Sequence, residues 1–404
     1  MLLFNFKGIL MNNQIEKLLN RGIITNILPS KEEFINRLNS KKQKFYIGAD
    51  ATSDSLHLSH AKNYQLLEEF RQLGHEVVVL FGDFTARIGD PTDKNSTRTK
   101  LTKNEVQKNV SCWLEQIQPL LDFNDPINPA KIAYNSEWLS KLNFEDILEL
   151  ASNFTVGQLL ERDMFTKRIN QDKPIFMHEF MYPMMQGYDS VAMDVDVELC
   201  GNDQTFNALV GRKLQKTINQ KDKFVVTVNL MENPLTGELM SKSRGTGIFL
   251  KFDAYDMFGS LMAQPDEMIK VFLINNTRIE LSEVEEIVRL HPRDAKIKMA
   301  FEVTKIMKSE EQASKAKERF INQFQKKKVL EEDMVNVIIQ EEQMGLFELV
   351  RKLLDNSFSN SDILRLIKQN AITVNNLKQT DKNMIISTEN IVVKIGKRKY
   401  FKIN

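Results

Sequence analysis

Residues 45–83 decide the fold, and they read FYIGADATSDSLHLSHAKNYQLLEEFRQLGHEVVVLFGD. The apolar run Phe45–Ile47 predicts a buried strand that ends at Gly48. Apolar residues then recur at helical spacing and predict a helix that ends at Gly74. A second apolar run, Val77–Phe81, predicts the next buried strand. Strand, helix and strand within one such stretch form a βαβ unit, which requires a parallel sheet.

Two histidines, His57 and His60, open the predicted helix. Residues at i and i+3 share a helix face, and the free backbone N–H groups of a first turn favour an anion. The pair therefore predicts a polyphosphate site at the carboxyl end of a strand. There are two alternatives for an isolated pair of this kind. His57 could cap the helix while the His60 ring packs in the core, or the two rings could form an incidental metal-binding pair.

A second motif lies far along the chain and favours the polyphosphate site. Residues 239–243 read LMSKS and are flanked by Gly237 and Arg244. Together with the HLSH segment, this motif resembles the HIGH and KMSKS signatures of the class I aminoacyl-tRNA synthetases, in the order in which that family carries them.

Composition sets broad limits. The 404 residues are enough for two or three domains, and 42% hydrophobic with 27% charged residues is typical of a globular protein in solution. The net charge of +1 means that any affinity for nucleic acid must come from local clustering of cations. The two cysteines have no metal-ligand spacing, so we expect a reducing compartment, the cytoplasm. The apolar part of residues 1–10 is too short to span a membrane, and either Met1 or Met11 is the true start.

The pattern predicts three domains in an α/β protein. Residues 1–246 are expected to form a Rossmann-like catalytic domain whose parallel sheet is interrupted by a helical insertion at 103–190. Residues 247–342 are expected to form a helical domain with a linker, with no strand from Asp253 to about Glu342. The resemblance to the class I synthetases implies that this domain lies on the anticodon side. Residues 343–404 predict a small α+β domain. Within the first domain we expect two short helices at 11–40.

The alternating segment 192–199 predicts a half-exposed strand. Its apolar side would be buried, and Asp194, Asp196 and Glu198 would face solvent. The strand ends in Cys200-Gly201-Asn202-Asp203-Gln204, which places an acid and an amide where open α/β sheets bind ligands.

The C-terminal segment is basic. From Gly345 onward there are 11 Lys and Arg against 5 Asp and Glu, a net charge of +6. Predicted helices at 346–354 and 361–369, with strands at 372–374 and 391–393, imply a core and disfavour a mere solubilising tail. A compact basic module on a nearly neutral chain indicates binding to RNA phosphates.

Two further segments carry polar side chains suited to a small ligand. Tyr182, Gln186 and Asp189 fall at i, i+4 and i+7, on one face of one predicted helix, among methionine and phenylalanine. They predict an enclosed pocket, with a solvated face as the alternative. Asp90 lies in a Gly-Asp-Pro turn and is followed by Lys94 and Arg98. The acid could hold an ammonium group and the two cations could reach phosphates. The alternative is an exposed loop with scattered charges.

The C-terminal module resembles the small RNA-binding fold at the end of bacterial tyrosyl-tRNA synthetases. With it, the chain resembles that family over most of its length, most of all the branch with GYDSVA, GNDQ and PRDAK segments. The resemblance implies a substrate, L-tyrosine, that reacts with ATP and is then transferred to tRNA(Tyr). Mg²⁺ would arrive with ATP, with no protein-bound metal and no organic cofactor. The resemblance also implies a homodimer that forms through the helical insertion at 103–190, which is the connective insertion of this family. No association with a membrane is expected.

The resemblance also implies roles for individual residues. Tyr46 and Asp189 would hold the substrate phenol, Asp50 would lie between the amino acid and the nucleotide, and Asp203 would bind the ribose. The implied tyrosine site is Tyr46, Gly48, Asp50, Asp90, Tyr182, Gln186, Asp189 and Gln204. The implied ATP site is Ala51, His57, His60, Gly201, Asp203, Met240, Ser241 and Lys242. The implied catalytic groups are Thr52, His57, His60, Lys242 and Ser243, with Lys94 and Arg98 as further candidates.

The residue types suit this chemistry. A phenol both donates and accepts, so a carboxylate and a tyrosyl hydroxyl satisfy it completely, whereas phenylalanine would leave both groups unpaired. No editing domain is expected, since the tyrosyl enzymes are the standard example of discrimination without one.

Three positions depart from the family pattern. Ser59 replaces the glycine of HIGH, Ala51 replaces a usual proline, and Leu239 replaces the first lysine of KMSKS. These three replacements are expected to affect the turnover rate more than the kind of reaction that is catalysed. The alternatives are a tryptophanyl-tRNA synthetase, a HIGH-type nucleotidyltransferase, and a non-catalytic RNA-binding relative.

Overall fold

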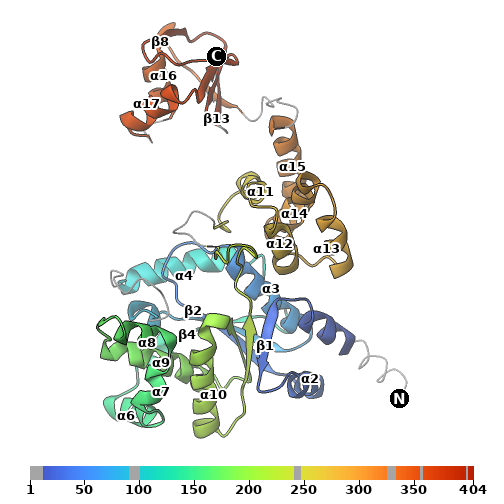
Figure 1. Cartoon of the computed structure of the whole chain (residues 1–404), viewed down its shortest axis with the longest axis vertical. Helices are drawn as coiled ribbons and strands as arrows, with labels where there is room; N and C mark the ends of the chain where they lie inside the picture. The colour runs from blue at the N-terminus through green and yellow to red at the C-terminus, as the bar shows by residue number, and fades with distance from the viewer. Residues whose placement is uncertain (1–11, 91–100, 241–246, 325–333, 355–357, 397–398) are drawn as a thin grey trace. The chain divides into compact units, whose positions relative to one another are not determined.

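The computed structural model describes residues 12–90, 101–240, 247–324, 334–354, 358–396 and 399–404. The chain divides into two compact units, Met1–Lys317 and Glu318–Asn404 (Figure 1). In the described ranges of both units, no helix combines the length and the apolar character needed to cross a bilayer.

A six-stranded sheet forms the centre of the first unit. Its strands are β1 (Ile24–Leu28), β2 (Lys44–Ala49), β3 (Glu76–Phe81), β4 (Lys131–Tyr134), β5 (Val197–Gly201) and β6 (Phe224–Val228). They lie in the order β1-β6-β5-β2-β3-β4, and only the β1–β6 pairing is antiparallel. The chain leaves β2 toward β3 and β4 on one side and returns through β5 and β6 on the other. The carboxyl ends of β2 and β5 therefore form a topological switch point, where open α/β sheets bind ligands.

The βαβ unit predicted from the sequence is confirmed. Helix α3 (Leu58–Gln72) connects β2 to β3, and Gly74 follows it with a φ of +93°, which a residue with a side chain adopts with difficulty. Phe45 and Phe70 stack at 4.3 Å between ring centroids beneath the sheet.

Two short edge strands were not predicted. The N-terminal region contains helical residues 12–19 and α2 (Lys31–Ser40), as expected, but β1 lies between them and pairs with β6. In the supposedly helical stretch 103–190, α4 (Lys103–Ile117) is followed by β4, which extends the sheet beside β3. Both strands lie at a sheet edge and are only partly buried, so neither shows a continuous apolar run.

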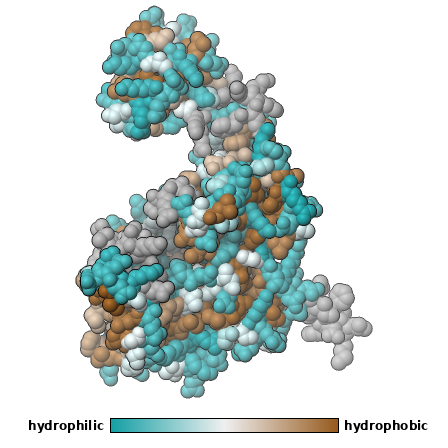
Figure 2. All heavy atoms as spheres, viewed as in Figure 1, coloured by the Kyte–Doolittle hydropathy of each residue, from teal (hydrophilic) through white to brown (hydrophobic). Residues whose placement is uncertain are grey.

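The helical insertion proper therefore begins after β4. It consists of α5 (Ser136–Leu139), α6 (Phe144–Ser152), α7 (Val156–Leu160), α8 (Asp163–Ile169) and α9 (Met177–Ala192). Figure 2 shows hydrophobic side chains at the surface over α6 and α7, where Phe144 and Val156 are largely exposed.

The prediction of a half-exposed strand at 192–199 is wrong. Helix α9 extends to Ala192, and β5 is buried on both faces because it lies between β2 and β6. Glu198, expected to face solvent, is 2% exposed, and Asp196 is also buried. Helix α10 (Thr205–Asn219) and β6 then complete this half of the sheet.

Helices α11 (Ala254–Met262), α12 (Met268–Asn276), α13 (Leu281–Val288) and α14 (Pro292–Met307) follow within the first unit. Helix α15 (Glu310–Phe324) then spans the boundary between the units.

The second unit has its own core. Strands β7 (Val335–Val337), β9 (Ile372–Val374), β10 (Leu377–Lys378), β12 (Ile391–Ile395) and β13 (Lys399–Ile403) form one sheet in the order β10-β9-β12-β13-β7. Strands β8 (Gln343–Gly345) and β11 (Ile385–Ser387) form another, with helices α16 (Leu346–Leu353) and α17 (Asn360–Lys368). The predicted helices and strands of this region are confirmed.

The boundary predicted at residue 343 is too late. Strand β7 pairs in parallel with β13, and Ile339 belongs to the same hydrophobic core. The expectation of no strand from Asp253 to about Glu342 is therefore wrong. A three-residue strand with exposed positions carries little periodic signal, which is why the sequence did not reveal it.

Candidate active site

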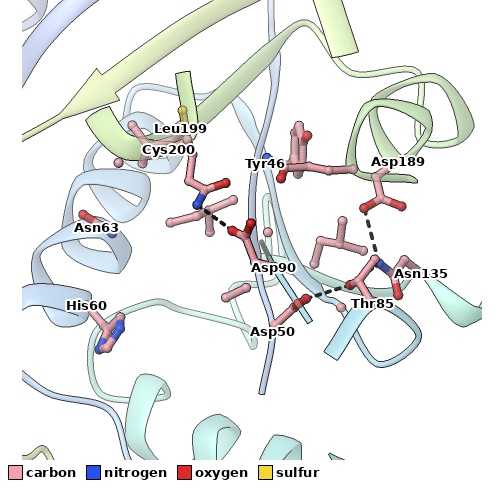
Figure 3. A pocket seen from close by; sticks show the side chains of 18 of the residues that line it. Tyr46, Asp50, His60, Asn63, Thr85, Asp90, Asn135, Asp189, Leu199 and Cys200 are labelled. Atoms are coloured by element: carbon pink, nitrogen blue, oxygen red, sulfur yellow. Dashed lines mark hydrogen bonds between the residues drawn. The ribbon is translucent and has the colours of Figure 1, made fainter. Parts of the chain in front are cut away.

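A cavity of about 320 Å³ opens at the carboxyl ends of β2 and β5 (Figure 3). This volume lies in the range of small-molecule sites. Its walls come from β2 and the segment after it, from α9, and from the segment that follows β5.

The predicted site residues that line this cavity are Tyr46, Gly48, Asp50, Thr52, His60, Asp90, Tyr182, Gln186, Asp189, Gly201 and Gln204. They come from β2, α3, α9, β5 and the adjoining segments, so the fold brings residues far apart in sequence to one cavity.

Asp189 and Tyr46 lie in one part of the cavity. The Asp189 carboxylate is 3% exposed and accepts hydrogen bonds from Trp138 Nε1 at 2.7 Å and Asn135 Nδ2 at 3.3 Å. The Tyr46 hydroxyl lies 3.0 Å from Ser190 Oγ. Figure 3 shows Asp189 beside Asn135. A buried carboxylate and a phenolic hydroxyl thus line the same pocket.

Burial changes the proton affinity of both groups. It raises the pKa of Asp189 well above its usual value, although the hydrogen bonds from Trp138 and Asn135 act in the opposite direction. It also raises the pKa of the Tyr46 phenol, with a further contribution from the charges of Glu198 and Asp189. Tyr46 therefore stays a neutral hydroxyl that can both donate and accept.

The other part of the cavity is rich in acceptors. The Asp50 carboxylate accepts from Tyr182 Oη at 2.9 Å and from Thr85 Oγ1 at 2.7 Å. Asp90 accepts from Gln204 Nε2 at 2.8 Å. Burial and the neighbouring Asp50 and Asp90 raise the pKa of Tyr182 well above its usual range. Carboxylates gathered in a pocket favour a cationic ligand group.

Gly82 leaves room for Asp50. A Cβ at residue 82 would lie 2.0 Å from Asp50 Oδ1 and 2.3 Å from Thr85 Oγ1, closer than atoms can approach. No side chain larger than hydrogen fits at residue 82 while Asp50 keeps this position.

The two histidines begin α3, but only His60 lines the cavity. Their rings are 3.9 Å apart between centroids, and the backbone N–H of His57 donates to His60 Nδ1 at 3.2 Å. Burial lowers the pKa of His57 to about 4 and that of His60 well below its usual value. Both rings are therefore neutral near pH 7 and each can donate one N–H.

Four other predicted residues lie outside the cavity lining. His57 pairs through its backbone with Phe249, and Ala51 is buried with its carbonyl accepting from Asn109 Nδ2. Met240 lines a separate small cavity with Met268. The Asp203 carboxylate folds against Gly201, where a Cβ would lie 2.4 Å from its Oδ1. Lys94, Arg98, Ser241, Lys242 and Ser243 lie outside the described residues.

Several polar groups of the site were not predicted. They are Thr85, Asn135, Trp138, Ser190, Glu198 and Lys223. Thr85 and Asn135 sit in short connections with no periodic pattern. Lys223 carries one usable signal, since it directly precedes the buried run of β6. Within the described residues, no group of three or more His, Cys, Asp or Glu is placed to hold a metal ion.

Comparison with known proteins agrees with this geometry. Residues 38–325 match the family described as tRNA synthetases class I (W and Y). The tyrosine–tRNA ligase of Thermotoga maritima is 39% identical over 96% of this chain and 96% of its own length. The tyrosine–tRNA ligase of Colwellia psychrerythraea is 41% identical over 92% of this chain and 94% of its own length.

Solved structures share the fold. A C-terminally truncated mitochondrial tyrosyl-tRNA synthetase of Coccidioides posadasii superposes with a TM-score of 0.63 at 21% identity, covering 77% of this chain and 95% of that one. The Archaeoglobus fulgidus tyrosyl-tRNA synthetase complexed with L-tyrosine gives a TM-score of 0.58 at 20% identity, covering 75% and 99%. The near full-length match to the curated ligases, together with the cavity at the switch point, leads to one conclusion: this chain belongs to the class I tRNA synthetases of the tryptophan and tyrosine type, and among them to the tyrosine–tRNA ligases.

Proposed function

We propose that the cavity at the ends of β2 and β5 is where L-tyrosine reacts with ATP to give tyrosyl-adenylate and pyrophosphate, before transfer of the tyrosyl group to tRNA(Tyr). The observation that carries this proposal is the pairing of the Asp189 carboxylate with the Tyr46 hydroxyl in one buried pocket.

In this proposal the substrate phenol lies between those two groups. Its O–H donates to Asp189, whose oxygens accept from Trp138 and Asn135 and keep lone pairs for a third donor. Its oxygen accepts from Tyr46. An indole has a donor and no acceptor, so it would leave the Tyr46 hydroxyl unsatisfied. This difference favours tyrosine over tryptophan.

The substrate ammonium lies at the acceptor-rich part of the cavity. Its three donors match the Asp90 carboxylate, the Tyr182 hydroxyl and the Gln186 carbonyl, with Gln204 beside Asp90. Tyr182 donates its own proton to Asp50, so its oxygen remains free to accept. Phenol and ammonium recognition in separate parts of the pocket fix the direction of the amino acid.

The reaction itself needs positioning more than proton transfer. The tyrosine carboxylate is ionised near neutral pH and attacks the α-phosphorus of ATP without a general base. Charge develops on the phosphate oxygens in the transition state, where donors stabilise it. Thr52 and His60 line the cavity and are proposed to contact the phosphates, and a neutral His60 donates one N–H. We assign the ribose to Asp203 and further phosphate contacts to His57.

The predicted cations complete this assignment. Lys242, Ser243, Lys94 and Arg98 are proposed to neutralise the pyrophosphate, and all lie outside the described residues. Mg²⁺ would accompany ATP and balance phosphate charge, held by phosphate oxygens and water. The acidic groups described above are engaged with Tyr182, Thr85 and Gln204, which fits an ion delivered by the nucleotide.

The rest of the chain is assigned to tRNA and to assembly. We propose that the basic second unit binds tRNA phosphates and that the helices following residue 247 face the anticodon side. The exposed hydrophobic residues of the insertion support a homodimer through that surface: Phe144, Leu148, Val156, Phe176 and Met177. Cys112 and Cys200 form no disulfide, which supports a cytoplasmic location.

The test is ATP–pyrophosphate exchange measured with each of the twenty amino acids. We expect tyrosine alone to stimulate exchange. Stimulation by tryptophan instead would establish the neighbouring specificity. Stimulation by no amino acid, with RNA binding retained, would show a non-catalytic relative.

A further inference from the structure

A lysine and a glutamate form an ion pair at the wall of the cavity, and the glutamate belongs to its lining. Lys223 precedes β6 and is fully buried, and Glu198 on β5 is 2% exposed. The Lys223 ammonium contacts Glu198 Oε2 and donates to Ser190 Oγ at 2.8 Å. A charge buried this deeply is costly unless it is paired and hydrogen-bonded, so the pair must be kept together.

Helix α10 leaves space for this pair at one residue. A Cβ at residue 211 would lie 2.6 Å from Lys223 Nζ and 2.9 Å from Ser190 Oγ. Glycine at this point of α10 therefore makes room for the ammonium and for the serine that it contacts.

The lysine acts on the phenol-binding part of the pocket through Ser190. Ser190 Oγ lies 3.0 Å from the Tyr46 hydroxyl, and the Lys223 ammonium is 5.9 Å from the centroid of the Tyr46 ring. A cation beside Ser190 Oγ turns the hydroxyl dipole so that its hydrogen points away from the lysine, toward Tyr46. Tyr46 then accepts from Ser190, and its own O–H is left to donate, to the neighbouring Glu198 carboxylate or to a ligand in the cavity.

The glutamate acts on the ammonium-binding part through Gln186. Glu198 Oε1 accepts from Gln186 Nε2 at 3.0 Å, and a carboxylate cannot donate. The amide nitrogen of Gln186 must therefore face Glu198, while its oxygen accepts from Asn207 Nδ2 at 2.9 Å on the other side. This fixes which end of the amide is offered to a cationic ligand group.

We propose that Lys223 and Glu198 form a positioning pair for the tyrosine site, with Lys223 directing the Tyr46 hydroxyl through Ser190 and Glu198 directing the Gln186 amide. Lys223 lies outside the cavity lining, whereas Glu198 forms part of the cavity wall. The inference rests on the proposed function of Tyr46 and Gln186, and it adds two residues whose task is to set hydrogen-bond directions before tyrosine arrives.

The test uses ATP–pyrophosphate exchange of the full chain with tyrosine and with phenylalanine. Ser190→Ala breaks the link to Tyr46 and removes no charge. We expect its KM for tyrosine to rise about 2- to 12-fold, the size of one lost hydrogen bond, while its KM for phenylalanine changes little. Glu198→Gln releases the Gln186 amide, and we expect it to raise the KM for both amino acids. In both variants kcat and the KM for ATP should stay within about threefold.

Two further variants separate positioning from stability. Glu198→Gln combined with Lys223→Met removes both charges, and we expect it to fold and to keep the raised KM for tyrosine. Arg71→Gln is the control. Arg71 is also a buried cation paired with carboxylates, those of Glu68 and Asp125, but it lies in the last turn of α3, at the other end of the helix from His60. It should reduce stability and leave the KM for tyrosine unchanged.

The outcomes are distinguishable. If Ser190→Ala and Glu198→Gln keep a normal KM and a normal tyrosine-to-phenylalanine ratio while Tyr46→Phe and Asp189→Asn lose them, the pair is only structural and the inference is overturned. If all four variants behave like the parent chain, the proposed tyrosine site itself is wrong.

Discussion

In the proposed tyrosine site, Asp189 and Tyr46 offer the substrate phenol one acceptor and one donor, and the protein arranges both before any ligand binds. Trp138 and Asn135 hold the carboxylate, and Ser190 holds the hydroxyl. The cost of burying a carboxylate is visible in its raised pKa. A group kept at such a cost, beside a cavity, is characteristic of a ligand site.

Asp189→Asn tests the acceptor. The amide has nearly the same size but presents a donor where the phenol must donate. We expect kcat/KM for tyrosine to fall about 10- to 100-fold, as for a lost hydrogen bond to a charged group, with the thermal midpoint unchanged or higher. Exchange kinetics and thermal denaturation measure the two effects. Unchanged tyrosine kinetics would remove Asp189 from the site.

The buried histidines predict how stability depends on pH. Burial lowers the folded-state pKa of His57 to about 4 and that of His60 further below its usual value of about 6.5. Between these values the unfolded chain binds more protons, so the free energy of unfolding falls as pH decreases from about 6.5 toward 4. Denaturant unfolding at pH 5 and pH 7 measures this loss.

The variant His60→Asn identifies the source of that pH dependence. Without the second imidazole, the difference in unfolding free energy between pH 5 and pH 7 should shrink. An identical difference in the variant would mean that other groups cause it.

The residue patterns predicted one part of this site and missed another. Tyr182, Gln186 and Asp189 share a face of α9, and helical spacing alone places them together. Glu198 was assigned to the solvent side because its segment alternates, yet both faces of β5 are covered. Whether a strand is central or at an edge depends on the neighbours it acquires, which spacing within one segment cannot show.

At the scale of elements, the site depends on how closely α9 and α10 approach. A Cβ at Gly187 of α9 would lie 2.9 Å from Val210 Cγ1, 3.0 Å from Leu214 Cδ1 and 3.2 Å from the backbone nitrogen of Gly211. The helix that carries Tyr182, Gln186 and Asp189 is therefore seated against α10 through a glycine contact.

Gly187→Ala should separate these helices. We expect a loss of about 1–3 kcal/mol in the free energy of unfolding, as for overpacking of a core, together with a higher KM for tyrosine. Gly157→Ala is the matched control, because its nearest neighbour would be Thr155 Oγ1 at 3.9 Å. That change, within the exposed helix α7, should be neutral or stabilising by up to about 1 kcal/mol. Equal stability of the two variants would contradict the close packing.

The order of elements was predictable where apolar runs are long. Strands β2 and β3 and helix α3 followed from their sequences, whereas β1 and β4 did not. Those two strands gain stability by pairing with an existing sheet edge, an interaction between segments that no local pattern records.

At the scale of the whole molecule, two units with separate cores suggest separable tasks. The second unit, Glu318–Asn404, has a continuous core that includes Leu346, Ile363 and Val393. The start of this unit could not be predicted from the sequence. Strand β7 joins the sheet although the polar, charged segment 340–343 (QEEQ) separates it from the rest of the unit.

Removal of residues 318–404 tests that division. The cavity lies wholly within the first unit, so ATP–pyrophosphate exchange should stay within about threefold of the parent chain. Charging of tRNA(Tyr) should fall at least about tenfold at low salt, and the difference from the parent chain should shrink as salt rises, because the parent's phosphate contacts weaken with salt. Full charging by the shortened chain would show that the second unit does not bind tRNA.

The placement of the tyrosine ring in the cavity is the feature on which all the proposed residue roles depend. A crystal structure with L-tyrosine and a non-hydrolysable ATP analogue measures it directly. We predict the phenolic oxygen within hydrogen-bond distance of both the Tyr46 hydroxyl and the Asp189 carboxylate, with the ammonium toward Tyr182 and Gln186. A ring bound in the reverse direction, or outside this cavity, would contradict the account.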